Sequence, residues 1–155
     1  MTWRGPRAGL AGTCLALSAA LFGTAAFAAS HEVVLPPGAV PMAAPAAYRV
    51  WSKRTEACSG LTGGFSSVKW YVVPDVKTFE TDQGPEVGMW ISDRTGDRIV
   101  IAGAYQNTEM VVRHELLHHL LRHEGHPAKY FVTRCHLTWE SWNPAPGSPG
   151  SGSGE

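Results

Sequence analysis

A histidine-rich helix is the strongest constraint that this sequence places on its fold. Residues 111–131 read VVRHELLHHLLRHEGHPAKYF and contain five of the seven histidines of the chain. Apolar residues recur there at helical spacing, Asn107 or Thr108 can cap the start, and Gly125 suits a left-handed position past the end. The pattern predicts a helix over 108–124, which must pack its apolar stripe against other elements.

The neighbouring segments predict what this helix packs against. Helical spacing of apolar residues, β-branched runs and turn residues define four further elements. These are a helix over 46–59 ended by Gly60, a strand over 67–74, a hairpin formed by 87–92 and 97–105, and a last helix over 127–137. The order predicts a small α+β domain, in which a short, mostly antiparallel sheet packs on the histidine-rich helix and two further helices.

The first 28 residues are arranged like a secretory signal peptide. Arg4 and Arg7 precede an apolar run, and small residues follow, with Ala26 and Ala28 at the expected cleavage positions. Cleavage after Ala28 would give a secreted or periplasmic protein without stable membrane insertion. An uncleaved membrane anchor is the alternative, although the apolar run is short for a spanning helix.

Composition divides the remaining chain into three parts. Residues 29–45 are rich in proline and alanine and predict an extended leader, and residues 143–155 form a Gly/Ser/Pro tail that we expect to be disordered. The folded domain is therefore expected over 46–142. Loss of residues 1–28 leaves 11 of the 13 basic residues against 13 acidic ones, so no basic stripe remains and no nucleic-acid partner is expected.

Two cysteines, Cys58 and Cys135, remain after the expected cleavage. In an exported protein such a pair most simply forms a disulfide, which here would join the first predicted helix to the last. The chain-entropy model assigns a bond closing so long a loop a stabilisation on the order of 4 kcal/mol. The alternative is two free thiols, one of which is a metal ligand.

The histidine-rich helix also carries the residues of a metal site. Residues four apart share a helix face, so His114 and His118 can direct their imidazoles at one ion, as tetrahedral Zn²⁺ requires. Glu115 follows the first ligand and can lean over the open side of the ion. There it can take a proton from an activated water and pass it to a leaving amine.

A catalytic zinc usually has three protein ligands, so a third is needed. On a continuous helix His119 points about 100° away from the ligand face. His123 also lies off that face, and Glu124 would need a break in the helix. His126 follows Gly125, which can turn the chain back toward the metal, and it is therefore the favoured third ligand.

The segment HELLHHLLRHEGHPAKYF resembles the active-site segment of zincin metallopeptidases, especially the SprT-like and WLM-type branches. These share a His-Glu-x-x-His helix, a short turn, a histidine followed by a small residue or proline, and then an aromatic residue. Here these features match His114, Glu115 and His118 on the helix, then His126 with Pro127, and then Tyr130 or Phe131. The resemblance covers about 20 residues, and the preceding strand and hairpin are compatible with a minimal zincin domain.

The resemblance implies Zn²⁺ bound by His114, His118 and His126, with Glu115 as the general base in hydrolysis of peptide bonds. The sequence departs from the metzincin branch, where glycine and histidine stand in place of Leu121 and Glu124. SprT-like proteins are largely intracellular, whereas this chain carries an export signal, so their substrates are not carried over.

Other residues are candidates for substrate binding and transition-state stabilisation. Tyr105, Tyr130 and His123 could stabilise the oxyanion, and 98–104 is the candidate edge strand for a peptide or protein substrate. The expected function is an exported zinc metalloendopeptidase. The alternatives are a zinc-binding protein without catalysis and a metal-dependent amidase that acts on a non-peptide, cell-wall linkage.

Overall fold

The computed structural model describes residues 34–142. The expected signal peptide, the first residues of the leader and the tail lie outside the described residues, so those expectations stay predictions. The elements in chain order are β1 (Val40–Pro41), α1 (Ala46–Ser59), the 3-10 helix η1 (Phe65–Ser67), β2 (Val68–Val73), β3 (Phe79–Thr81), β4 (Gly84–Glu86), β5 (Gly88–Asp93), β6 (Gly96–Ala102), the 3-10 helix η2 (Gly103–Tyr105), α2 (Glu109–Leu121) and the π-helical segment η3 (Lys129–Arg134).

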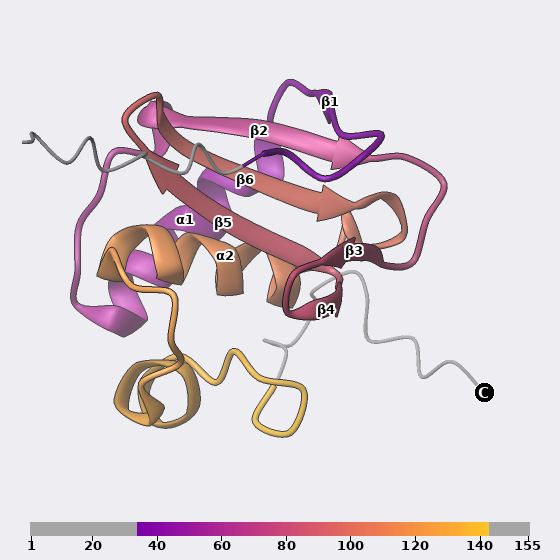
Figure 1. The fold of residues 1–155 in the computed structure, drawn as a ribbon. Coiled ribbons are helices and arrows are strands. Elements are labelled where there is room, and N and C mark those ends of the chain that lie inside the picture. The colour runs from indigo at the N-terminus through magenta and orange to yellow at the C-terminus, as the bar shows by residue number, and fades with distance from the viewer. Residues whose placement is uncertain (1–33, 143–155) are drawn as a thin grey trace, which may run out of the picture. The chain divides into compact units, whose positions relative to one another are not determined.

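Four strands form one mixed sheet in the order β1-β2-β6-β5, and β3 pairs with β4 in a separate hairpin (Figure 1). The β1–β2 and β5–β6 pairings are antiparallel, whereas β2 and β6 run parallel. The α+β class is thus confirmed, and two of the three pairings in the sheet are antiparallel as expected. The parallel centre arises because the chain leaves β2, forms the β3–β4 hairpin and returns as β5 before adding β6.

Strand β6 lies between β2 and β5 and is buried on both faces. Ile99 and Ile101 pack with the helices, while Val100 and Ala102 belong to a second apolar cluster on the other face. A continuous apolar run is typical of such a central strand. The expectation that 98–104 is an exposed edge for peptide binding is therefore wrong, and the edge beside α2 is β5.

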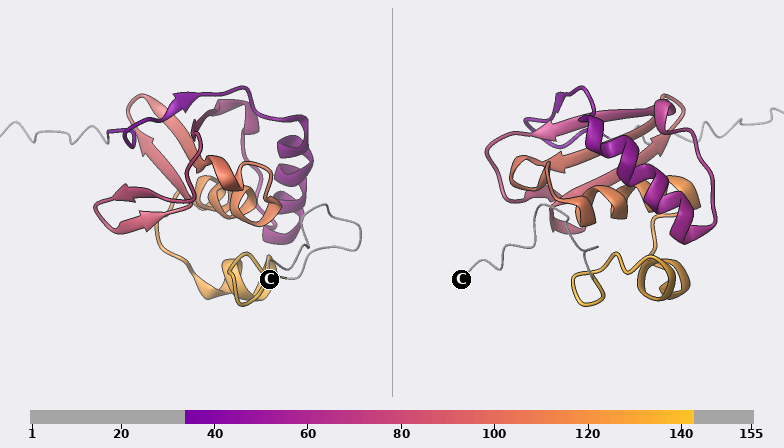
Figure 2. Two further views of the ribbon diagram at one scale, coloured as in Figure 1. Left: turned by 90° about the vertical axis from the view of Figure 1, so that its right-hand side faces the viewer. Right: turned by 180° about the vertical axis from the view of Figure 1, so that it is seen from behind.

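Helices α1 and α2 lie on the same face of the sheet (Figure 2). Tyr48, Trp51 and Thr55 form the buried face of α1 at helical spacing, and Gly60 ends this helix in the left-handed conformation. On the opposite face of the sheet, apolar residues of the segment before β1 and of β3 cover β6. The part of the expected leader from residue 34 onward therefore packs against the domain, and its strand β1 pairs with β2.

Helix α2 ends earlier than expected. The left-handed residue after it is Arg122, with φ 55°, and not Gly125 three residues later. The backbone N–H of Arg122 returns to the carbonyl of His118, and its guanidinium forms an ion pair with Asp97 at the start of β6. The sequence pattern predicts glycine at the left-handed position. The ion pair with Asp97 offsets the strain of placing Arg122 there instead.

The segment after α2 returns along the helix to α1. A π-helical turn, η3, replaces the α-helix expected over 127–137, and Cys135 directly after it forms the expected disulfide with Cys58 of α1. A disulfide is typical of proteins that fold in an oxidising compartment. Within residues 34–142, no helix combines the length and apolar character needed to cross a membrane.

Candidate metal centre

Three histidines from two segments converge at the edge of the sheet. His114 and His118 lie one turn apart on α2, and His126 approaches them from the loop before η3. The Nε2 atom of His114 lies 2.9 Å from that of His126 and 3.2 Å from that of His118, and the third side of the triangle is also 3.2 Å. The three ring nitrogens therefore face one common point.

Backbone carbonyls fix the protonation of two of these rings. The Nδ1–H of His114 donates to the carbonyl of Leu137 at 2.7 Å, and that of His118 donates to the carbonyl of His123 at 2.8 Å. A carbonyl can only accept, so the proton of each neutral ring must be on Nδ1. The facing Nε2 atoms of His114 and His118 consequently carry lone pairs, which cannot hydrogen-bond to one another but can ligate a cation.

Burial keeps both helix histidines neutral. It lowers the pKa of His114 to about 4, which outweighs the hydrogen bond to Leu137. Burial likewise lowers the pKa of His118 to about 4, against the hydrogen bond to His123. Neutral imidazole is the form that binds metal ions, so these two rings need not lose a proton to bind at pH 7.

The distances in the triangle fit a metal ion. Ligand nitrogens at about 2.0–2.1 Å from a tetrahedral zinc lie about 3.3 Å apart, and the observed separations of 2.9–3.2 Å are close to this value. Phe131 of η3 is fully buried and packs against all three rings, with centroid separations of 4.7–4.9 Å. The three-histidine group can therefore hold a metal ion without rearrangement of its rings.

Glu115 lies between the metal group and the edge of the sheet. Its side chain is buried, and the backbone N–H of Trp90 in β5 donates to its carboxyl group. A Cβ at Gly88 would lie 2.7 Å from Glu115 Oε1, so this carboxyl group occupies space that only glycine leaves free. Burial, followed by the charge of Glu86, raises the pKa of Glu115 to about 8.

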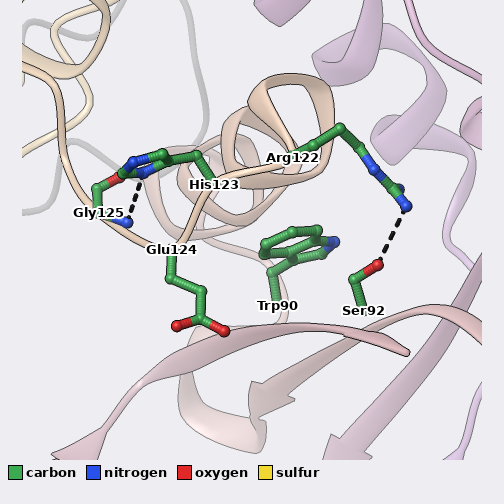
Figure 3. A pocket seen from close by; sticks show the side chains of 6 residues that line it. All are labelled: Trp90, Ser92, Arg122, His123, Glu124 and Gly125. Atoms are coloured by element: carbon green, nitrogen blue, oxygen red, sulfur yellow. Dashed lines mark hydrogen bonds between the residues drawn. The ribbon is translucent and has the colours of Figure 1, made fainter.

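One cavity adjoins the metal group, and a second lies beside the turn that follows α2. One has a volume of about 300 Å³ and is lined by His114, Glu115 and His126 together with residues before β5 and after η3. The other, of about 640 Å³, is lined by Trp90 and Ser92 of β5 and by the turn Arg122–Gly125 (Figure 3). Only the smaller of the two cavities is lined by ligand histidines and by Glu115.

The other three candidates for the third ligand do not belong to the metal group. They are His119, His123 and Glu124. The buried His119 places its Nδ1 2.8 Å from Asp97 Oδ2, on the sheet side of α2. The His123 ring accepts a hydrogen bond from the Gly125 N–H, and it is the backbone carbonyl of His123 that orients His118. Glu124 lines the larger cavity (Figure 3). The chain does break before Glu124, contrary to expectation, and that break brings His126 to the group.

The tyrosines expected as transition-state stabilisers have other contacts in the structure. Tyr105 meets Trp139 edge to face, with ring centroids 6.0 Å apart. Tyr130 has the cationic groups of Lys129 and Arg134 over its ring, 5.1 and 5.8 Å from the centroid. Neither tyrosine is among the residues that line the two cavities.

Several residues of the site gave no sequence signal. The carbonyls of Leu137 and His123 act through the backbone, whose direction no side-chain pattern encodes. The sequence around Gly88 does not distinguish it from other glycines near strand ends, although its missing side chain leaves room for Glu115. Phe131 was noted only as an aromatic residue at a suitable distance from His126, whereas it supports all three ligand rings.

Comparison of the chain with models of known protein families, with curated proteins and with solved structures found no match. Membership of the zincin family is therefore not shown. The metal group, the buried carboxyl group and the cavities carry any functional conclusion by themselves.

Proposed function

We propose that this chain is an exported zinc-dependent peptidase, in which His114, His118 and His126 bind zinc and Glu115 is the general base. The observation that carries this proposal is the triangle of Nε2 atoms, which face one point beside a buried carboxyl group. The disulfide between Cys58 and Cys135 supports export, since such bonds persist in oxidising compartments.

Zinc is the metal that best suits this donor set. Three imidazole nitrogens with no carboxylate among them favour a borderline-soft ion over Mg²⁺ or Ca²⁺, which prefer oxygen ligands. If held by His114, His118 and His126, zinc would supply Lewis acidity, which lowers the pKa of a water and polarises a carbonyl. A structural zinc site would more commonly be closed by a fourth protein ligand.

The role of Glu115 follows from its position and its environment. A divalent cation beside the carboxyl group favours the carboxylate form, which opposes the effect of burial. In that form Oε1 or Oε2 can accept a proton from the attacking water and later return it to the leaving nitrogen. The hydrogen bond from the Trp90 N–H holds the carboxyl group in place during both transfers.

The substrate class rests on the outer edge of β5, which pairs with no strand other than β6 among residues 34–142. Val87 accepts a hydrogen bond from Ala102, so by alternation the backbone groups of Gly88, Trp90 and Ser92 point away from β6. The Trp90 N–H among them donates to Glu115, and a peptide would pair with the remaining groups. An extended peptide can add as a further strand along this edge and would then pass over Glu115 and the metal group. A peptide or protein is therefore the proposed substrate.

Paired Glu115→Gln and wild-type proteins test this function. Both are purified as the mature chain, loaded with one equivalent of zinc and incubated with a mixture of unrelated peptides, whose cleavage is followed by mass spectrometry. We expect equal zinc content in the two proteins and a loss of turnover in Glu115→Gln by about 10²- to 10⁴-fold. Replacing His118 by alanine should remove both zinc and turnover.

Other outcomes would contradict the proposal in distinguishable ways. Stoichiometric zinc without cleavage of any peptide would indicate a zinc-binding protein. Hydrolysis of cell-wall fragments, but not of peptides, would indicate an amidase. Absence of zinc from both proteins would remove the basis of the proposal.

A further inference from the structure

The smaller cavity beside the metal group carries information about the substrate, if the proposed hydrolysis holds. Its volume is about 300 Å³, and its lining joins the ligands His114 and His126 to Glu86 on one side and to Trp139 and Glu140 on the other. Glu86 ends β4 directly before the edge strand β5, whereas Trp139 and Glu140 follow η3. A group beside the bond to be cleaved would enter this cavity.

The charged residues of this cavity are nearly all acidic. Glu86, Glu115 and Glu140 contribute three carboxyl groups, and no lysine or arginine is among its lining residues. The larger cavity differs, since Arg122 and His123 line it together with Glu124 (Figure 3). The two cavities are therefore electrostatically different, and only the smaller one, which adjoins the metal group, favours a cation.

The carboxylates of Glu86 and Glu140 have no ion-pair partner within residues 34–142. Several other carboxylates in that range are paired, such as Glu109 with Arg54 and Arg113, and Asp93 with Arg98. Glu86 is half-buried and Glu140 is exposed. Both carboxylates are therefore available to a cationic ligand that enters the cavity.

Trp139 adds an aromatic face to the same cavity. Its side chain is 61 % exposed, although most of the large apolar side chains in the described range are buried. An exposed tryptophan ring can pack along the methylene groups of a long side chain and attract a cation over its face. This observation is independent of the carboxylates and points to the same kind of ligand.

We propose that this cavity is a specificity pocket for a cationic group of the substrate next to the hydrolysed bond, bound by Glu86, Glu140 and Trp139. The group is an ammonium or a guanidinium. It comes either from a lysine or arginine side chain or from the free amino terminus of a peptide, and the two sources present the same chemistry to the carboxylates.

A peptide series with one varied position tests the pocket. Lysine, arginine, norleucine or glutamate is placed at each site around the cleaved bond, once with an acetylated and once with a free amino terminus. For the wild-type zinc protein we expect kcat/KM for lysine or arginine to exceed that for norleucine by about tenfold or more at one site. Preference in the acetylated series assigns a side chain, whereas preference confined to the free series assigns the terminal ammonium.

Matched variants attribute the preference to named residues. In the double variant Glu86→Gln and Glu140→Gln, the ratio of lysine to norleucine should fall toward one, while zinc content stays the same. Glu124→Gln removes a carboxylate from the larger cavity and should keep the wild-type ratio. Raising the salt concentration to 0.5 M should reduce the ratio of lysine to norleucine in the wild type. This measurement does not depend on the folding of any variant.

The outcomes separate this inference from the proposed function. Cleavage with equal kcat/KM for lysine and norleucine at every site, in both series, overturns the pocket and leaves the peptidase intact. An unchanged ratio in the double variant also overturns it. Failure to cleave any peptide overturns the peptidase and the pocket together.

Discussion

Helix α2 carries two buried polar clusters that differ in how their members are satisfied. In the first, Glu109 pairs with Arg54 at 2.7 Å and with Arg113 at 3.0 Å, and Arg113 also donates to Thr55. Each charge there has a partner of opposite sign. In the second, His114 and His118 present lone pairs to each other at 3.2 Å.

The difference shows which cluster has all its polar groups satisfied by the protein itself. The Glu109 cluster joins α1 to α2 and needs nothing from outside the protein. The histidine cluster is held in place by two carbonyls and a phenyl ring, yet its nitrogens gain nothing from one another. Protein interiors seldom tolerate facing acceptors, so this arrangement is expected where a cation completes the group.

The largest expected effect comes from breaking the complete cluster. Glu109→Ala leaves the buried guanidinium of Arg113 without its carboxylate, and we expect the free energy of unfolding to fall by about 3–5 kcal/mol. Chemical denaturation measures this change. Glu80→Ala, at an exposed position of β3, is the control and should stay within about 0.5 kcal/mol. A loss below 1 kcal/mol for Glu109→Ala would show that the cluster is not a structural link.

The incomplete cluster should respond to metal where the complete one does not. Zinc at 100 times its Kd should stabilise the wild type by about 2.7 kcal/mol, because it binds the folded chain. His118→Ala should abolish this gain. His123→Ala is the matched control: it removes an exposed ring but keeps the carbonyl that orients His118, so the gain should persist. Equal responses of the two variants would contradict the assigned ligands.

The sequence predicted most of these features from local patterns. Helical spacing placed His114, Glu115 and His118 correctly, and β-branched runs located β2 and the β5–β6 hairpin. Local patterns cannot report which strand becomes central, since this depends on the order in which β5 and β6 add to β2. They consequently failed on the parallel pairing and on the edge strand.

The third ligand shows the limit of reasoning from spacing. His126 was favoured because Gly125 follows the helix, and the structure does bring His126 to the other two histidines. The turn, however, begins at Arg122, whose positive φ is offset by an ion pair with Asp97, 25 residues earlier in the chain. Such a long-range contact leaves no trace in the local sequence.

Glu115 should make the stability of the metal-free protein depend on pH. Its pKa rises from an ordinary 4.5 to about 8 in the folded state, so between these values the folded chain holds a proton that the unfolded chain releases. Stability is therefore lost as the pH rises through this range. Glu115→Gln has no titrating group at this position. Its free energy of unfolding should therefore rise relative to that of the wild type by on the order of 2 kcal/mol between pH 5 and pH 8.

Denaturation of both metal-free proteins at a series of pH values measures this difference. Comparing the two chains cancels the opposite contribution of His114 and His118, whose lowered pKa values make stability fall as the pH drops from 6.5 toward 4. Saturating zinc should abolish the advantage of the variant at pH 8, since the cation stabilises the carboxylate. Parallel pH curves for the two proteins would contradict the burial of Glu115.

The smallest expected change in stability falls on the contact between Glu115 and β5. An alanine Cβ at position 88 would lie 2.7 Å from Glu115 Oε1 and 2.9 Å from its Cγ, so the buried side chain would have to shift. Gly88→Ala should therefore lower the free energy of unfolding by about 1 kcal/mol. Because the general base is displaced, kcat should fall by about 10- to 100-fold while zinc content stays the same. Gly64→Ala, at φ −81° and outside the lining of both cavities, makes the same chemical change and should leave kcat unaltered. Wild-type turnover in Gly88→Ala would show that catalysis does not depend on the position of Glu115 beside β5. Glu115 would then have a structural role, like Glu109 in the first cluster, and not a catalytic one.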